Sequence, residues 1–342
     1  MRLITTLLLS AGLCLATLSA HAADTARVSL FSWPGYGFWF IAKEKNLVPD
    51  LDLEISVIED PYESFSLMTS GGLDVTSSTA EYGPIAADKN VPVKLVTYTN
   101  PSYGTDKIIL APGVKGAQDL KGKSVAVLEG GLTQIFMGIW LEQNGVSIKD
   151  VKFTNLIMDD AVGALVGGDV QAAEFWEPFG SHALEALPGA TVAATSAQGG
   201  WIETALLGDG MYMSDAFLND QPALAEKTMQ AYFKAVDYWK AHPAEGNQII
   251  AKALGFPLAD VEKVLGKDGK IYKGGIWVFD AQQAGRFMGV VPGELPLGQS
   301  NGQMAKHWQT TTDWWLKFGL IEQRHPIEDG VNLAPLKAVL AQ

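Results

Sequence analysis

Two large aromatic residues, Trp33 and Tyr36, lie in a glycine-rich turn where they could form one wall of a binding site. The turn spans residues 33–37, between an apolar run at 28–31 and a predicted helix at 38–44. Pro and Gly indicate a turn because Gly adopts backbone angles closed to other residues. In an open α/β sheet, ligands bind at the carboxyl ends of strands, where such turns lie. The alternative is a strand–helix junction whose aromatic side chains belong to the core.

Strands and helices alternate along the rest of the chain, which is typical of an α/β fold. Apolar or alternating runs predict strands, and runs with helical spacing predict the helices between them. The alternation implies a mostly parallel sheet. The predicted strands are 28–31, 51–58, 73–76, 93–98, 124–128, 152–157, 170–176 and 191–194, and long helices are predicted at 221–242, 244–254, 258–265, 302–318 and 333–340.

A second strand–glycine–helix junction at residues 124–144 resembles the first and indicates that a second α/β unit begins there. From Ala205 the chain is expected to cross back to the first unit. We therefore expect two lobes. The first lobe comprises residues 23–105 and 208–342, and the second comprises residues 106–207.

The first 22 residues have the pattern of a cleavable secretory signal peptide. Arg2 is the only charged residue before Asp24, an apolar run follows it, and Ala20-His21-Ala22 is a small-x-small cleavage site. The single cysteine, Cys14, lies inside this segment. The mature chain is therefore expected to be exported to the periplasm without thiols or disulfides, so a large core must stabilise it.

Length and charge narrow the function classes. A chain of 342 residues with 47% hydrophobic residues can form two globular domains. Its formal net charge of −13 is unsuited to binding nucleic acid or an anionic membrane surface.

Four local phrases, in this order, resemble the periplasmic solute-binding proteins of ABC importers, and most closely the taurine, nitrate and aliphatic-sulfonate group. One is the opening strand with its aromatic turn and helix. The others are Gly-Gly-Leu-Asp-Val at 71–75 with the segment 86–96, Leu-Lys-Gly-Lys-Ser-Val-Ala-Val at 120–127, and Ala-Ala-Glu-Phe-Trp-Glu-Pro-Phe at 172–179. The resemblance implies a type II-like, two-lobed α/β protein whose ligand cleft lies between the lobes and closes by hinge motion.

The same resemblance implies a function and a set of partners. We expect an extracytoplasmic substrate-binding subunit that delivers a small solute to an ABC permease in the inner membrane. It would be a monomer without cofactor, metal or nucleic acid, and without enzymatic activity.

The resemblance implies which segments of this chain line the ligand cleft. These segments are rich in aromatic residues and carboxylates and contain no Lys, Arg or His. Carboxylates and aromatic faces suit a cation, at roughly 0.5 to 2 kcal/mol per cation–π contact. We therefore expect a small cationic or nitrogen-rich solute, such as an amine, a guanidinium or urea-like compound, or a pyrimidine. The expected ligand-binding residues are Trp33, Tyr36, Phe38, Ser78, Thr79, Glu81, Tyr82, Tyr103, Glu129, Gly131, Thr133, Trp176, Glu177, Trp201 and Glu203.

Other interpretations stay open. Backbone N–H groups around residues 129–131 could instead bind a small anion such as taurine, an alkanesulfonate or nitrate. Glu81 could simply favour a helix start through the helix dipole. An enzyme is disfavoured because the chain has no Gly-x-Ser-x-Gly turn, its histidines are isolated, and the mature chain has no cysteine. A sensor subunit that signals to a receptor would share the fold and the site.

Overall fold

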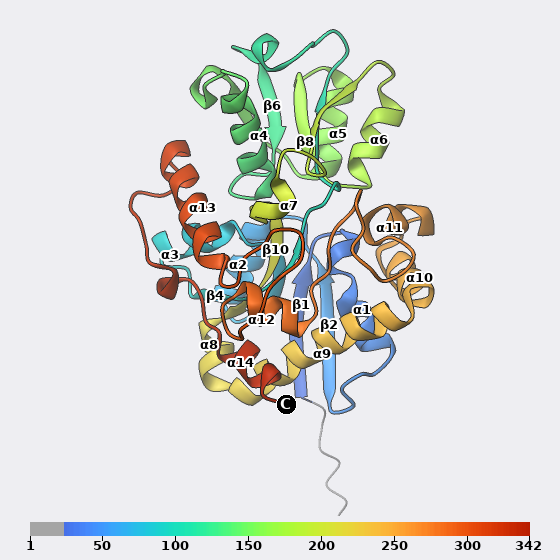
Figure 1. The fold of residues 1–342 in the computed structure, drawn as a ribbon, viewed down its shortest axis with the longest axis vertical. Coiled ribbons are helices and arrows are strands. Elements are labelled where there is room, and N and C mark those ends of the chain that lie inside the picture. Colours follow the sequence, from blue (N-terminus) through green and yellow to red (C-terminus); the bar gives the residue numbers. More distant parts are fainter. Residues whose placement is uncertain (1–23) are drawn as a thin grey trace, which may run out of the picture.

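The structure, a computed structural model, describes residues 24–342 and contains two five-stranded sheets (Figure 1). The signal peptide predicted at residues 1–22 lies outside the described residues. The first sheet has the order β2-β1-β3-β10-β4. Its strands are β1 (Asp24–Leu30), β2 (Leu51–Val57), β3 (Val75–Thr79), β4 (Val93–Pro101) and β10 (Gly208–Ser214).

The second sheet has the order β7-β6-β8-β5-β9. Its strands are β5 (Lys107–Leu110), β6 (Ser124–Val127), β7 (Lys152–Asn155), β8 (Ala172–Phe175) and β9 (Thr191–Thr195). The chain passes from the first sheet to the second between β4 and β5, and returns between β9 and β10.

Both sheets are mixed, but in each of them four strands run in one direction and a single strand runs against them, which agrees with the expectation of a mostly parallel sheet. β1 runs parallel to β2 and β3, and β6 runs parallel to β7 and β8. β10 is antiparallel to both of its neighbours, and so is β5. These two strands run in the opposite direction because each directly follows a segment that crosses between the sheets. The α/β class itself is confirmed.

Helices flank both sheets (Figure 1). Around the second sheet lie α4 (Leu132–Gln143), α5 (Met158–Gly167) and α6 (Phe179–Ala186), and α7 (Trp201–Thr204) lies on the way back. The remaining helices are α1 (Phe38–Glu44), α2 (Pro61–Thr69), α3 (Tyr82–Asp88), α8 (Asp215–Asp220), α9 (Pro222–Ala241), α10 (Pro243–Leu254), α11 (Leu258–Leu265), α12 (Ala281–Phe287), α13 (Met304–Phe318) and α14 (Ala334–Leu340). Four short 3-10 helices complete the elements: η1 (Pro34–Tyr36), η2 (Ala117–Leu120), η3 (Ile148–Asp150) and η4 (Ile327–Asp329).

The long helices after residue 221 are confirmed to within a few residues, whereas α6, α8 and α12 were not predicted. Each of the three is short, so its periodic signal is weak. α12 does carry a capping box, in which Asp280 and Gln283 each accept a bond from the backbone N–H of the other.

Helix α13 contacts a residue beside the first sheet and a helix beside the second sheet. Its Trp315 Nε1 donates to the carbonyl of Glu81, just before α3, at 2.7 Å. At its C-terminal end, Lys317 Nζ lies 2.8 Å from a carboxylate oxygen of Glu142 in α4. The helix therefore links the two halves of the molecule on one side of the space between them. No helix within residues 24–342 has both the length and the apolar character needed to cross a bilayer.

Candidate functional site

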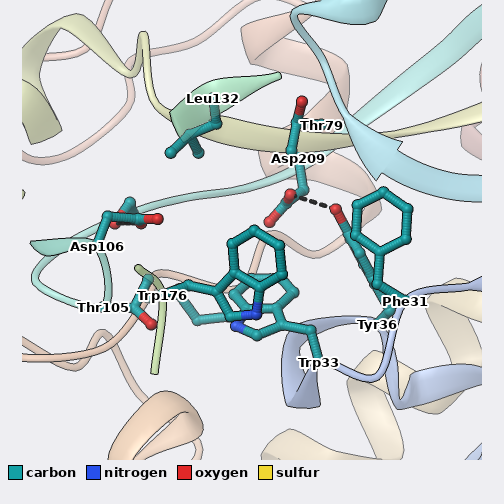
Figure 2. A pocket seen from close by; sticks show the side chains of 11 residues that line it. Phe31, Trp33, Tyr36, Thr79, Thr105, Asp106, Leu132, Trp176 and Asp209 are labelled. Carbon is teal, nitrogen blue, oxygen red and sulfur yellow. Dashed lines mark hydrogen bonds between the residues drawn. The ribbon is translucent and has the colours of Figure 1, made fainter. Parts of the chain in front are cut away.

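A small cavity lies where the ends of strands from both sheets meet (Figure 2). Its water-accessible volume is about 20 Å³, enough for about one water molecule. Contributions come from the turn after β1, the ends of β3 and β8, the start of β10, the start of α4 and the segment between β4 and β5. The lining residues are Phe31, Trp33, Tyr36, Thr79, Ser102, Thr105, Asp106, Leu132, Trp176, Asp209 and Ile276.

Aromatic side chains from both halves form one wall of the cavity. Phe31, after β1, stacks on Trp176, after β8, with ring centroids 6.2 Å apart and planes 18° apart. Trp33 packs edge-to-face on Tyr36 at 4.9 Å. The Trp33 ring lies directly over Gly35, where an added Cβ would be only 2.0 Å from the ring. Glycine at this position therefore lets the indole lie flat against the turn.

Asp209 forms a second wall and is paired with Tyr36. It stands opposite Thr79 in the β3–β10 ladder, and the Tyr36 hydroxyl donates to its Oδ1 at 2.5 Å. Both side chains are buried. Burial raises the pKa of Asp209 well above its ordinary value, although the bond from Tyr36 opposes this. The pKa of Tyr36 is also raised well above its ordinary value, by burial and by the charge of Asp209.

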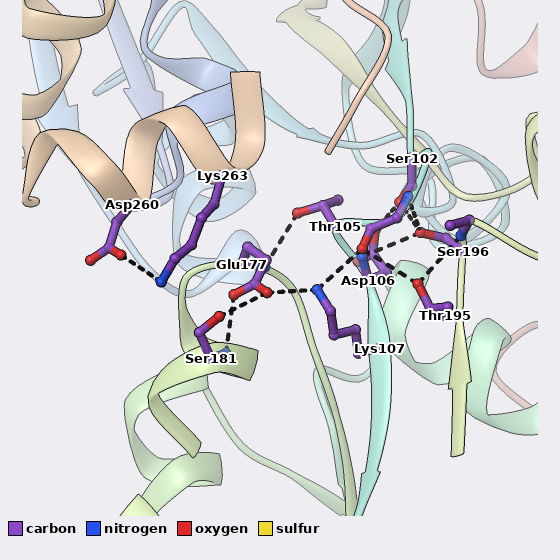
Figure 3. Close-up of polar contacts among 12 residues, drawn as sticks. Ser102, Thr105, Asp106, Lys107, Glu177, Ser181, Thr195, Ser196, Asp260 and Lys263 are labelled. Carbon is purple, nitrogen blue, oxygen red and sulfur yellow. Dashed lines mark hydrogen bonds and ion pairs between the residues drawn. The ribbon is translucent and has the colours of Figure 1, made fainter. Parts of the chain in front are cut away.

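Asp106, just before β5, is the second acidic residue of the cavity (Figure 3). Ser102 donates a hydrogen bond to its carboxylate, and Ser102 also bonds Ser196 at 2.6 Å. Burial raises the pKa of Asp106 to about 6, while the bond from Ser102 and the charge of Lys107 act in the opposite direction. The Lys107 ammonium itself is bound to Glu177, 2.6 Å away. Asp106 therefore has no directly paired cation.

Buried hydrogen-bond donors also reach the cavity. Trp33 Nε1, Trp176 Nε1 and Thr79 Oγ1 are buried and have no hydrogen-bond partner among residues 24–342. Buried polar atoms in folded proteins are nearly always bonded to something. These three atoms could therefore bond a solute or an ordered water that offers an acceptor.

The structure brings four of the predicted ligand-binding residues together at the cavity: Trp33, Tyr36, Thr79 and Trp176. Several more are fully buried but do not line it. Phe38 packs edge-to-face on Tyr232 and Trp239, and Thr133 bonds the backbone of Leu128. Ser78 and Glu81 lie in β3 and just after it, with Glu81 Oε1 3.4 Å from His307 Nε2.

The other predicted residues lie farther out or have partners within the protein. Tyr82 donates its hydroxyl proton to the carbonyl of Glu129 at 3.1 Å, across the junction with the second half, and Gly131 is packed against the same ring. Glu177 is paired with Lys107. Tyr103 and Trp201 are half-buried, and the side chains of Glu129 and Glu203 are exposed.

Sequence reasoning missed the two aspartates that line the cavity. Asp209 does carry a signal, because it stands between Gly208 and Gly210 in an otherwise apolar strand. Each glycine is required by close packing, since an added Cβ would lie 1.7 Å from Tyr98 and 2.4 Å from Leu95 respectively. Asp106 precedes the apolar run of β5 without any local signal of this kind. The other lining residues that were not predicted are Phe31, Ser102, Thr105, Leu132 and Ile276.

The residues around the site form no metal-binding cluster within the described part of the chain. No group of three or more His, Cys, Asp or Glu side chains there could hold a metal ion. The cavity residues offer aromatic faces, two carboxylates and a few neutral donors. Such a set suits recognition of a small solute by charge, stacking and hydrogen bonds.

Two α/β halves joined by two crossing segments, with a cavity at the strand ends between them, define the fold of the periplasmic solute-binding proteins. A sequence model of the family described as NMT1/THI5 like matches residues 33–246. This chain belongs to that family.

Solved structures show the same fold. The alkanesulfonate-binding protein SsuA from Xanthomonas axonopodis pv. citri, bound to MOPS, is 18% identical, with a TM-score of 0.70 over 91% of this chain and 99% of that chain. The nitrate-binding protein NrtA from Synechocystis PCC 6803 is 17% identical, with a TM-score of 0.71 over 93% and 89%. The desulfurization enzyme DSZB is 14% identical, with a TM-score of 0.58 over 93% and 99%.

Curated relatives match a shorter stretch. A putative binding protein from Brucella abortus is 25% identical over 158 residues, which is 46% of this chain. The chain spans about half the length of the curated relatives it matches, 49%.

Proposed function

We propose that this protein is the extracytoplasmic substrate-binding subunit of an ABC transporter, and that it captures a small cationic or nitrogen-rich solute in the cavity. The transport role is supported by family membership and by structural neighbours that are mostly binding proteins. The solute class is supported by one observation. Two buried carboxylates, Asp106 and Asp209, line the cavity, and none of its lining residues, all in the described part of the chain, is Lys, Arg or His.

Charge complementarity favours a cation over an anion here. An anion beside Asp106 would meet a carboxylate in a site shielded from water, where like charges repel strongly. A cation would gain charge pairing there, and the faces of Trp33 and Trp176 would each add roughly 0.5 to 2 kcal/mol. A flat amidinium, guanidinium or pyrimidine would add stacking on the same rings.

A small anion is the second candidate, because one specific observation favours it. The unpartnered donors of Trp33, Trp176 and Thr79 suit a ligand that carries hydrogen-bond acceptors. Alkanesulfonate and nitrate, which the names of two structural neighbours mention, carry only acceptors at their charged ends. A urea-like solute would satisfy both sets, since it carries N–H donors and a carbonyl acceptor.

We also propose that the protein consists of two moving lobes and delivers its solute to a membrane partner. Residues 23–105 with 208–342 and residues 106–207 would move as two lobes about the segments near residues 105 and 207. The protein would act as a periplasmic monomer and deliver its solute to an inner-membrane permease. Catalysis is not part of the proposal, although DSZB shows that an enzyme can have this fold.

A thermal-shift screen of the purified protein tests the solute class. A ligand that binds only the folded state raises the unfolding midpoint by mass action. The panel contains guanidinium, methylammonium, urea and pyrimidines, together with taurine, methanesulfonate and nitrate. We expect midpoint shifts with the cationic or nitrogenous compounds. A shift with methanesulfonate or nitrate alone would overturn this solute class and favour the anion candidate.

A pair of matched variants tests the cavity itself. Trp33→Phe removes an unpartnered N–H and part of an aromatic face, so we expect at least about threefold weaker binding of any compound that shifts the midpoint. Trp314→Phe makes the same change on α13, where Trp314 packs on Phe318 and does not line the cavity. It should leave binding unchanged. Equal affinities in both variants would place the binding site elsewhere.

A further inference from the structure

Glu174 is a buried carboxylate that does not line the cavity but lies beside one that does. It is fully buried in β8, and no N–H or hydroxyl group among the described residues donates a hydrogen bond to either of its carboxylate oxygens. An ionised carboxylate in such a place is costly, because nothing replaces its hydration. Burial raises the pKa of Glu174 well above its ordinary value, and the charge of Asp106 and a hydrogen bond between the two carboxyl groups raise it further.

Strand pairing explains why these two acids are neighbours. β5 and β8 are antiparallel, with Ile108 opposite Glu174 and Lys107 opposite Phe175. Asp106 directly precedes β5, two residues before Ile108. Because side chains alternate along strands, Asp106 and Glu174 lie on the same face in diagonal positions across the pair.

Lys107 is the basic residue whose charge acts on both acids within residues 24–342, and its ammonium group is bound elsewhere. Lys107 Nζ bonds Glu177 at 2.6 Å and the carbonyl of Gly104 at 3.2 Å (Figure 3). Ser102 and Ser196, from the two crossing segments, bring only hydroxyl groups to the side of Asp106.

The remaining charged groups around Asp106 are acids. The charge of Glu81 raises the pKa of Asp106. Asp209 lines the same cavity and accepts a hydrogen bond from Tyr36. Asp106, Glu174 and Asp209 are all buried at or beside the cavity, so they cannot all be ionised at neutral pH without strong mutual repulsion.

We propose that Glu174 holds a proton beside Asp106 while the cavity is empty, and that a cationic solute bound against Asp106 expels this proton to the solvent. The inference rests on the proposed function, because only a positive ligand lowers the energy of ionising both carboxylates. Charge is balanced, since one positive charge enters the site and one proton leaves it. Glu174 is thus a positioning residue that sets the charge of the site without contacting the solute.

The proposal gives a definite sign to the pH dependence of binding. If a proton leaves when a cation binds, cation affinity rises with pH, by up to about tenfold per pH unit. Binding of an anion would instead take up a proton and weaken with rising pH. A structural role for Glu174 alone would change neither slope.

The first test needs no ligand. Carboxyl carbon-13 NMR of the ligand-free, glutamate-labelled protein reports the ionisation state of each glutamate. We expect a protonated side-chain signal near neutral pH that disappears in Glu174→Gln. The signal should persist in Glu81→Gln, which alters another fully buried glutamate. A fully ionised Glu174 in the ligand-free protein would overturn the proposal.

The second test counts protons on binding. Titration calorimetry with guanidinium chloride, in buffers of different ionisation enthalpy between about pH 6 and 8, gives the protons released. We expect release in the wild type and much less in Glu174→Gln. Equal release in both variants would overturn the role of Glu174. Binding of methanesulfonate with proton uptake, and none of guanidinium, would overturn the cationic solute class, while the NMR result would still decide the state of Glu174.

Discussion

Two glutamates at the end of the same strand, Glu174 and Glu177, have opposite electrostatic environments although both are buried. Glu177 binds Lys107 at 2.6 Å and accepts bonds from the hydroxyl and the backbone N–H of Ser181, both at 3.0 Å. Burial alone would raise the pKa of Glu177, but Lys107 and Ser181 outweigh it, so the pKa is lowered. Glu174 has no such partners, and its pKa is raised.

The comparison shows that burial alone does not decide the state of an acid, because partners such as Lys107 and Ser181 can outweigh it. Lys107 serves Glu177 and leaves Asp106 and Glu174 without a paired cation. The charge of Glu177 is already balanced by Lys107, so Glu177 offers little attraction to a cationic ligand. The charge left uncompensated beside the cavity is what a cationic solute would meet, and the following changes test this difference.

The largest effect is expected from Lys107→Met, which removes the partner of Glu177. A buried carboxylate would then be left unpaired, and removing one partner of a buried pair typically destabilises a protein by about 3 to 5 kcal/mol. Chemical denaturation near neutral pH measures the loss. The double variant Lys107→Met/Glu177→Gln should recover much of it. A loss below about 1 kcal/mol would mean that the pair behaves like an exposed salt bridge.

Asp106 and Glu177 should change the stability of the folded state in opposite directions as the pH rises. The pKa of Asp106 is raised to about 6, so the folded state holds a proton that the unfolded state loses near pH 4. Its contribution is therefore lost as the pH rises from about 4 to 6, by about 2 to 3 kcal/mol. The lowered pKa of Glu177 gives the opposite sign, since its contribution is present above its ordinary pKa of about 4.3 and is lost as the pH falls below it.

Variants assign each part of that pH profile. Denaturation across this range should show the loss between about pH 4 and 6 become smaller by about 2 to 3 kcal/mol in Asp106→Asn. A loss of the same sign should remain, because the pKa values of Glu174 and Asp209 are also raised. The loss of stability at lower pH should become smaller in Glu177→Gln. An Asp106→Asn profile identical to that of the wild type would show that Asp106 has an ordinary pKa in the folded protein.

Binding should be affected by Asp106 and not by Glu177. Asp106→Asn removes the ionised acid of the cavity while conserving its shape, so we expect at least about tenfold weaker binding of guanidinium, since a hydrogen bond to a charged group contributes about 1.5 to 3 kcal/mol. Isothermal titration of both variants gives the affinities, with Glu177→Gln as the isosteric control. If Glu177→Gln weakened binding as much as Asp106→Asn, the contrast between the two acids would be wrong.

Much of the fold could be predicted from the sequence, because its signals are local. Glycine turns after apolar strands placed both strand–helix junctions, and helical spacing located the helices from α9 to α11. The antiparallel direction of β5 and β10 could not be predicted, because it depends on how the chain returns between two sheets.

Prediction of the site was limited by side-chain direction. The aromatic turn placed Trp33 and Tyr36 correctly at the cavity, because a turn at the carboxyl end of a strand lies at the edge of the sheet where ligands bind. In the second junction the same reasoning selected Glu129, whose side chain is exposed, while Leu132 reaches the cavity. Composition indicated an acidic, aromatic site, but the acids that line it are Asp106 and Asp209, whose meeting requires the tertiary fold.

The smallest effect is expected from Glu129→Gln, which changes an exposed acid near the cavity. Its side chain is exposed, and only its backbone bonds neighbours, with the N–H donating to Asn155 and the carbonyl accepting from Tyr82. Water screens such a charge, so binding and stability should each change by less than about 0.5 kcal/mol. Calorimetry and denaturation beside Asp106→Asn measure both. If Glu129→Gln weakened cation binding as strongly as Asp106→Asn, the charge that attracts the solute would lie at the protein surface rather than on the buried Asp106.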